Sequence, residues 1–333
     1  MSSESYITPG ELYFLREIDV LSEELSPYTK IGIVKLERES TKRKREHQIG
    51  NPRNLVLAHV VPTECVSSAE KYLHWRYVSL GVRGEWFKLN DQQLGEAVKY
   101  AELIRDNFAS RISALRAGSE LSKVASDESI RASSDEARHW QYEYHVAHVI
   151  STAADKARAL FNDAMKDAVR EGTDVSSVGA VNVVEKPTFD KVAFREAEPA
   201  LWAECSPIEI SSSFSAGRAD ESAKADSRTT SAALQIAALV QAVEELKKGR
   251  LSFDQVSQID FAVLAATNFY GREKELARLH LQAICGTAKG IEGVLKWERT
   301  AEPAFSVNLL KERHPEMYKK YSKLTAHETV SRK

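Results

Sequence analysis

The sequence has few of the residues that would tie it to a disulfide scaffold or to a membrane. Its three cysteines, Cys65, Cys205 and Cys285, lie far apart and form no CxxC pair. This spacing argues against a zinc ribbon and favours a reducing compartment. No run approaches the roughly 18 apolar residues of a membrane span, and the first residues lack the basic start and apolar core of a signal peptide. We therefore expect a cytoplasmic protein without a membrane partner.

An excess of one charge is also lacking. The net charge of −2 at pH 7 provides no global positive field, so any binding of nucleic acid must come from a local patch. The sequence has no GxxxxGK[ST] loop, GxGxxG fingerprint or GxSxG elbow, which argues against an NTPase, a dinucleotide enzyme or an α/β-hydrolase. Its 333 residues, 43% of them hydrophobic and 28% charged, fit a globular protein of two or three domains.

The first quarter of the chain combines β-branched runs with charged helical segments. Residues 12–18 and 30–35 predict an antiparallel hairpin, and the apolar residues 54–61 predict a central strand. The charged residues 37–48 predict an exposed helix that ends at Gly50-Asn51-Pro52. The predicted order is strand, strand, helix, strand, helix and strand, over residues 12–18, 30–35, 37–48, 54–61, 67–80 and 82–89.

The rest of the chain is predicted to be mostly α-helical. Asn90 is placed as an N-cap, with Gln93 at the spacing of a capping box. Helical periodicity on both sides of a polar break predicts an antiparallel helical hairpin, which is a candidate homo-oligomerisation element. The expected domains are an α+β domain at 1–90, this hairpin at 91–171, a linker with a partly ordered segment at 172–230, and a C-terminal helical domain with a basic tail at 231–333.

A basic cluster lies on the first predicted helix. Between residues 30 and 53 the sequence has eight Lys or Arg and three Glu, which is the electrostatic signature of a site for a phosphate backbone. A solvated charged helix is the alternative interpretation. Arg43 and Arg45 cannot both face the same way on a helix. Candidate nucleic-acid contacts are Lys42, Lys44, Arg45 and Arg53.

Two further candidates come from spacing. Glu70 and His74 lie four residues apart on a predicted helix and share a face, and Mg²⁺ is often held by only one or two carboxylates. An ordinary exposed helix face explains the same pair. Tyr13 and Lys30 come from the two hairpin strands, and a nearby cation favours a phenolate that could accept a proton. Packing in the core is the alternative for Tyr13.

The order of these residues resembles the GIY-YIG nuclease superfamily, in the branch of phage and bacterial multidomain proteins. Leu12-Tyr13 match the first motif and Lys30-Ile31-Gly32 the second. The further matches are Arg43, Gly50-Asn51-Pro52, Glu70 with His74, and Gly84-Glu85-Trp86-Phe87. The resemblance covers about residues 10–90 and does not extend beyond Asn90.

This resemblance implies a small three-stranded antiparallel sheet flanked by helices, and cleavage of DNA with one Mg²⁺ or Mn²⁺ ion. The resemblance also implies that Glu70 binds the metal, that Arg43 contacts the scissile phosphate, and that Tyr13 activates or positions the attacking water. Two positions depart from the pattern. Glu11 replaces a glycine, and Lys30 replaces a tyrosine. Protonated Lys30 cannot act as a base, so His74 becomes the alternative general base.

The sequence thus predicts a metal-dependent DNA endonuclease, with a weaker inference of phage defence, restriction or mobile-element biology. Two alternatives stay open. The replacement of tyrosine by Lys30 is compatible with a nucleic-acid-binding module that has lost catalysis. The helical majority and the slight negative charge are compatible with a protein-interaction scaffold, for which DNA binding would be absent or independent of salt.

Overall fold

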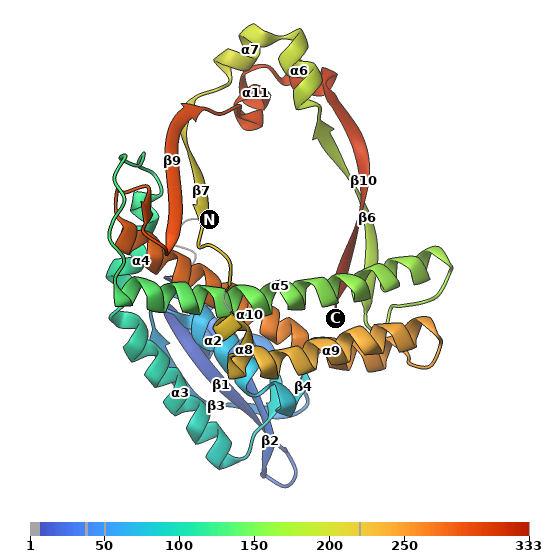
Figure 1. Cartoon of the computed structure of the whole chain (residues 1–333). Coiled ribbons are helices and arrows are strands. Elements are labelled where there is room, and N and C mark those ends of the chain that lie inside the picture. The colour runs from blue at the N-terminus through green and yellow to red at the C-terminus, as the bar shows by residue number, and fades with distance from the viewer. Residues whose placement is uncertain (1–6, 37–38, 50, 220, 333) are drawn as a thin grey trace. The chain divides into compact units, whose positions relative to one another are not determined.

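The computed structural model describes residues 7–36, 39–49, 51–219 and 221–332 (Figure 1). The chain divides into two compact units, and each unit is assembled from three separate segments. The segments of the first unit are Met1–Ser119, Ser134–Arg158 and Arg218–Ile284. The segments of the second unit are Glu120–Ser133, Ala159–Gly217 and Cys285–Lys333. Both units therefore depend on contacts between distant parts of the sequence.

The first unit contains an antiparallel sheet with the strand order β3-β1-β2-β5-β4. Strands β1 and β2 lie inside the sheet, and the β1 side chains from Leu12 to Leu15 are at most 1% exposed. The expectation that residues 54–61 form the central strand is wrong, because β3 lies at one edge of the sheet and pairs only with β1. The expected antiparallel sheet is present, but it has five strands rather than three, since the segment after the second helix forms a short hairpin. The strands are β1 (Gly10–Ile18), β2 (Leu25–Lys35), β3 (Asn54–Thr63), β4 (Gly81–Arg83) and β5 (Trp86–Lys88).

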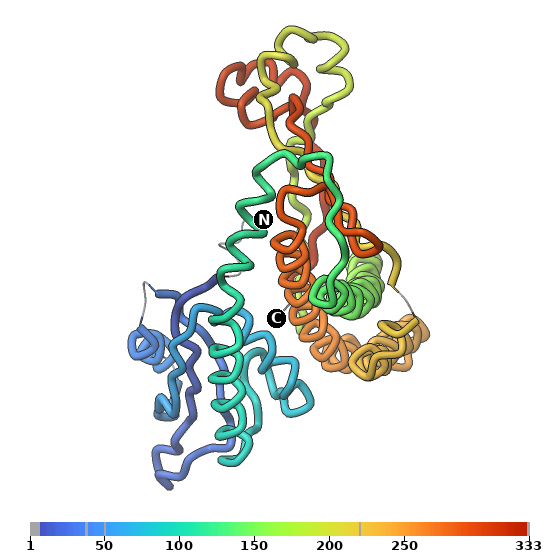
Figure 2. Tube along the Cα trace, turned by 60° about the vertical axis from the view of Figure 1, so that its left-hand side comes forward, coloured from blue at the N-terminus to red at the C-terminus, as the bar shows by residue number. Residues whose placement is uncertain are grey.

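Helices cover both faces of this sheet. Helix α1 (Ser40–Gln48) lies on the face that carries Tyr13, where the Tyr13 hydroxyl is 3.3 Å from the ring of His47. Helices α2 (Val66–Arg76) and α3 (Asp91–Ala109) pack on the opposite face, in one core with Leu12 and Phe14. Figure 2 shows α3 running along the sheet. The helix predicted from residue 91 therefore completes the sheet core, although the expected boundary at residue 90 would separate the two.

The predicted start of α3 is confirmed. The Asn90 side chain accepts a hydrogen bond from the Gln93 amide at 2.8 Å, and the Gln93 side chain accepts one from the Asn90 amide at 3.0 Å. This reciprocal capping satisfies two backbone N–H groups that the first helical turn leaves without partners. The local sequence alone is sufficient to fix this boundary.

The remainder of the first unit is helical. The other helical elements are η2 (Val78–Leu80), α4 (Ile112–Leu121), α5 (Asp135–Arg170), α8 (Glu221–Ala225), α9 (Ser227–Lys247) and α10 (Phe253–Cys285). Helices α4 and α5 each continue past the boundary between the two units. Apolar residues of α5, α8, α9 and α10 meet in one core that also receives Trp75 of α2. No helix of the described residues is long and apolar enough to cross a membrane.

The second unit contains two antiparallel sheets, four short helices and the C-terminal part of α5. Strand β6 (Gly179–Phe189) pairs with β10 (Ser322–Arg332), and β9 (Leu295–Pro303) lies between β7 (Ile208–Ser215) and β8 (Gly290–Ile291). The helices are α6 (Lys191–Ala197), α7 (Pro199–Glu204), α11 (Val307–Arg313) and α12 (Pro315–Lys320). Phe194, Cys205 and Leu310 are buried among aromatic side chains in a core between these helices.

These elements differ from two expectations. The stretch 172–230, expected to be a linker, contains the complete strands β6 and β7 and the helices α6, α7 and α8. The tail after α12, expected to be basic and polar, is strand β10. Each strand is mostly exposed, and its partner lies 80 or more residues away. Without a buried face, these strands lack the alternation by which a strand is recognised in sequence.

Candidate functional site at the edge of strand β2

The candidate site lies where the sheet edge is open. Strand β5 pairs with β2 only from Tyr28 to Lys30, and the Glu85 carbonyl then accepts a hydrogen bond from the Ile31 amide at 3.0 Å. Beyond this point, helix α2 reaches the edge of β2. Nε2 of His74 donates to the Ile31 carbonyl at 3.0 Å. Side chains from both faces of the sheet can therefore meet at this edge.

Gly32 makes that meeting possible. A Cβ atom at this position would lie 2.5 Å from the hydroxyl oxygen of Tyr13, which no real side chain could tolerate. The phenol ring, which is fully buried, therefore lies across the glycine and extends toward the edge of the sheet. The glycine of the KIG motif is required for the position of Tyr13.

Arg43 and His47 place two basic groups against this phenol. They are four residues apart on α1 and share its inner face. The Arg43 side chain is close enough to Tyr13 to oppose the rise in the pKa of the phenol, and it donates from Nη1 to Oε2 of Glu46 at 2.6 Å. On the other side of α1, Lys42 and Arg45 are exposed. The separation of Arg43 from Arg45 that helical geometry predicts is confirmed.

Helix α1 is fixed to the sheet at both ends. At its start, Oε2 of Glu11 accepts a hydrogen bond from the Ser40 amide at 3.0 Å, so a carboxylate from β1 caps the positive end of the helix. At its end, Oε1 of Gln48 accepts from the Leu55 amide at 2.8 Å. Glu11, which replaces a glycine of the family motif, thus has a structural role in holding the helix that carries Arg43.

Lys30 forms an ion pair with Glu85 rather than remaining free for a ligand. Its side chain is about 10% exposed, and Nζ contacts Oε2 of Glu85. Gly84 adopts a φ of 57° in the β4–β5 turn, a conformation that favours glycine, and it precedes Glu85 directly. The expectation that Lys30 assists Tyr13 is therefore modified, because the lysine charge is largely neutralised by this carboxylate.

Glu70 lies half-buried beside this ion pair and has no hydrogen bond or ion pair with any described residue. The pKa of its carboxyl group is raised to about 7, mainly by burial and also by the negative charge of Glu85, while Lys71 and Lys30 oppose the rise. Burying a carboxylate without a partner costs free energy. A cation at this point would remove that cost.

The titration of the neighbouring groups decides which of them can act as a base. Burial raises the pKa of Tyr13 to about 12, although Arg43 opposes the rise, so the phenol is neutral at pH 7. The expectation that nearby cations make Tyr13 a phenolate is thus opposed by its burial. Burial lowers the pKa of His47, as do the charges of Lys30 and Arg43, and burial lowers the pKa of His74. Both imidazoles are therefore neutral near pH 7 and able to accept a proton.

The candidate nucleic-acid contacts are not members of this group of site residues. Lys42 and Arg45 are exposed and Lys44 is half-buried on α1. Arg53 donates from Nη1 to Oε2 of Glu17 at 3.0 Å, so part of its charge is neutralised. Glu37, Arg38 and Gly50, which entered the charge count and the motif match, lie outside the described residues.

The residues fit a metal ion that is held mainly by water and substrate. No group of three or more His, Cys, Asp and Glu side chains converges in the part of the chain that the structure describes. Mg²⁺ needs only one or two carboxylates when phosphate and water supply its other ligands. Glu70, half-buried and unpaired among the described residues, is the carboxylate that fits, and Glu85 is close enough to affect its pKa.

Sequence reasoning missed His47, and it noticed Glu11 and Glu85 as parts of the motifs without assigning either of them its role in the site. His47 shares the spacing of four with Arg43, a signal that was present in the sequence. Glu11 and Glu85 gave no such signal, since each acts through a residue more than 25 positions away. Comparisons of the chain with protein-family models, with curated proteins and with solved structures gave no match. The resemblance to GIY-YIG nucleases therefore rests on the sequence motifs.

Proposed function

We propose that this protein is a metal-dependent endonuclease that hydrolyses phosphodiester bonds of DNA. The observation that carries the proposal is the unpaired, half-buried carboxyl group of Glu70, which is close enough to Tyr13 to raise its pKa. Tyr13 in turn contacts the α1 residue His47, and Arg43 is close enough to oppose the rise in its pKa. Phosphodiester hydrolysis requires a positioned water, a proton acceptor and positive charge for the phosphate. Residues at the β2 edge can supply each of these functions.

In this proposal, Glu70 holds one Mg²⁺ or Mn²⁺ ion. When bound, such an ion neutralises charge on the phosphate and lowers the pKa of water. The Arg43 guanidinium binds the non-bridging oxygens of the phosphate and stabilises the charge that develops there. Exposed Lys42 and Arg45 on α1 add a sequence-independent attraction to the backbone of the DNA. Pairing of two copies through the helical region remains a prediction.

A relay through Tyr13 reconciles its high pKa with a role in activating water. The hydroxyl oxygen of Tyr13 accepts a proton from the attacking water while its own proton passes to Nε2 of neutral His47. The charge on the phenol is unchanged throughout the step, and the imidazole becomes protonated. The separation of 3.3 Å between the two atoms is compatible with a hydrogen bond that tightens when substrate binds.

Cleavage of supercoiled plasmid and of short single-stranded and duplex oligonucleotides tests the proposal. Wild type, Glu70→Gln and the matched control Glu64→Gln, at an exposed glutamate next to α2, are compared with Mg²⁺, with Mn²⁺ and with EDTA. We expect metal-dependent cutting by wild type and by the control, and none by Glu70→Gln. Equal cutting by all three proteins would refute the site. DNA binding without cutting by any of them would favour the inactive binding module.

A further inference from the structure

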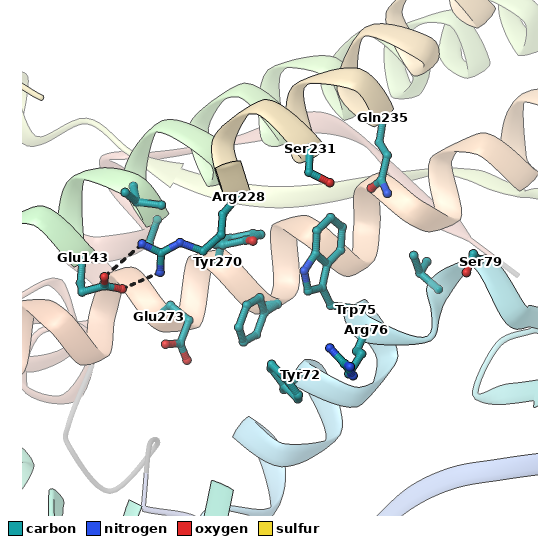
Figure 3. A pocket seen from close by; sticks show the side chains of 14 residues that line it. Tyr72, Trp75, Arg76, Ser79, Glu143, Arg228, Ser231, Gln235, Tyr270 and Glu273 are labelled. Carbon is teal, nitrogen blue, oxygen red and sulfur yellow. Dashed lines mark hydrogen bonds and ion pairs between the residues drawn. The ribbon is translucent and has the colours of Figure 1, made fainter. Parts of the chain in front are cut away.

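A cavity of about 520 Å³ lies among the helices of the first unit, and its size is typical of a small-molecule site. Its walls come from α2, η2, α5, α9 and α10 (Figure 3). Helix α2 contributes to this cavity with Tyr72 and Trp75, and to the β2 edge with Glu70 and His74. The proposed nuclease site uses none of the residues that line the cavity.

Four aromatic side chains form one wall. Tyr72 and Phe269 meet edge to face with their ring centroids 5.5 Å apart, and Trp75 and Tyr270 do the same at 5.5 Å. Two of these rings come from α2 and two from α10. The interlocking fixes the rings, and the faces of aromatic rings attract cations through their quadrupoles.

The positively charged donors of the cavity are already engaged. Arg228 donates from Nη1 and Nη2 to both carboxylate oxygens of Glu143, at 2.8 and 3.0 Å, as the dashed lines of Figure 3 show, and it also binds Asp226. Arg76 donates from Nη2 to the Tyr100 hydroxyl at 2.6 Å and covers the ring of that tyrosine. Neither guanidinium is well placed to receive an anion.

The acceptors of the cavity are less well satisfied. The carboxylate of Glu273 has no hydrogen bond or ion pair with any described residue, and burial raises its pKa to about 7 against the opposing charges of Arg111 and Arg272. Oε1 of Gln235 is buried and has no hydrogen-bond partner among the described residues. The cavity therefore holds unsatisfied acceptors, while its two guanidinium groups are already engaged. A ligand that donates hydrogen bonds and carries a positive charge would complement these acceptors.

We propose that this cavity binds an organic cation, a guanidinium or alkylammonium group with a short apolar substituent. The charged group pairs with Glu273 and lies against the rings of Trp75 and Tyr72, and the apolar part fills the space beside Phe269. The cation can come from a free small molecule or from an Arg or Lys side chain of a peptide. This inference does not depend on the proposed nuclease activity.

Calorimetric titration with n-butylguanidinium and with its neutral analogue n-butylurea tests the proposal. Charge-assisted hydrogen bonds are about twice as strong as neutral ones, so we expect the guanidinium to bind at least about tenfold more tightly than the urea. In Glu273→Gln the difference should disappear, while the exposed control Glu102→Gln should retain it. A short blocked peptide with one arginine, titrated in parallel, distinguishes the two sources by which ligand binds more tightly.

A second readout removes the dependence on one variant. Quenching or a shift of tryptophan fluorescence by n-butylguanidinium should be lost in Trp75→Phe, whose fold is checked by circular dichroism. Equal affinity of wild type for the guanidinium and the urea, or no binding of either probe or of the peptide at millimolar concentration, would overturn the proposal.

Discussion

Two half-buried glutamates of the first unit, Glu70 and Glu273, share one property and differ in everything around it. Burial raises the pKa of each to about 7, and neither has a hydrogen bond or ion pair among the described residues. Glu70 lies near the edge of β2, where the charges of Glu85, Lys71 and Lys30 act on it. Glu273 lies in a cavity with aromatic walls and engaged donors. An unpaired, half-buried carboxylate thus indicates only that a bound cation would be stabilising.

The neighbours decide which cation fits. At the β2 edge, exposed basic side chains on α1 can bind a phosphate, and water can complete the shell of a small hard ion. In the cavity, ring faces and apolar atoms replace water, which favours a large, weakly hydrated cation. The same local perturbation therefore supports two different ligands, and the four predictions below test that separation.

The largest expected effect in these tests comes from Arg43. In the proposed reaction, Arg43 stabilises charge on the phosphate, so its substitution by alanine should lower kcat for DNA cleavage by about 10²- to 10³-fold. The matched variant Arg45→Ala, on the outer face of the same helix, should change it by less than about threefold at moderate salt. Plasmid nicking rates measure both. Equal losses would mean that α1 acts only by its net charge.

The proton relay predicts a smaller but more specific effect. Tyr13→Phe and His47→Gln should each lower kcat by about 10²-fold, the usual contribution of general acid–base catalysis. Because the two groups act on one proton, the double variant should be no slower than either single variant. Single-turnover rates of wild type, both single variants and the double variant, at saturating Mg²⁺, test this prediction. If the fold-decrease of the double variant equalled the product of the two single decreases, the relay would be excluded.

Substitution of either glutamate by glutamine is expected to weaken the binding of that site's own ligand by at least about tenfold, since the ligand loses its charged partner. Glu70→Gln should weaken Mn²⁺ binding and leave n-butylguanidinium binding unchanged, and Glu273→Gln should do the reverse. Calorimetry with both ligands on both variants gives the four numbers. If one variant weakened both ligands, the two sites would not be separate.

The smallest effect concerns stability. Both carboxyl groups have pKa values of about 7 in the folded protein and 4.5 as the ordinary value, so unfolding releases protons and the free energy of unfolding falls as pH rises from 4.5 through 7. Replacing either glutamate by glutamine should stabilise the metal-free protein by on the order of 1 kcal/mol at pH 8, and not at pH 4.5, after allowance for solvent screening. Urea unfolding at the two pH values measures it. An equal gain in the free energy of unfolding at both pH values would mean that the effect comes from packing and not from ionisation.

Much of the first unit could be predicted because its signals are local. The β-rich run of β1, the alternation of β2, the apolar run of β3, the charged helix α1 and the capping box at Asn90 each lie within about a dozen residues. The candidate residues Tyr13, Arg43, Glu70 and His74 were found by motif and spacing, and the structure brings them to one edge of the sheet. The strands of the second unit were missed, because β6 and β10 are mostly exposed and pair across more than 130 residues.

By itself, the sequence determined the identity and order of the elements around the sheet, since hydrophobic period, caps and turn glycines act between near neighbours. Only the tertiary structure decided that Glu11 caps α1, that Glu85 forms an ion pair with Lys30, and that His47 contacts Tyr13. It also decided that four rings and Glu273 line one cavity. The physical reason is that burial and pairing depend on which groups the fold brings together, and the pKa of a carboxyl group depends on both.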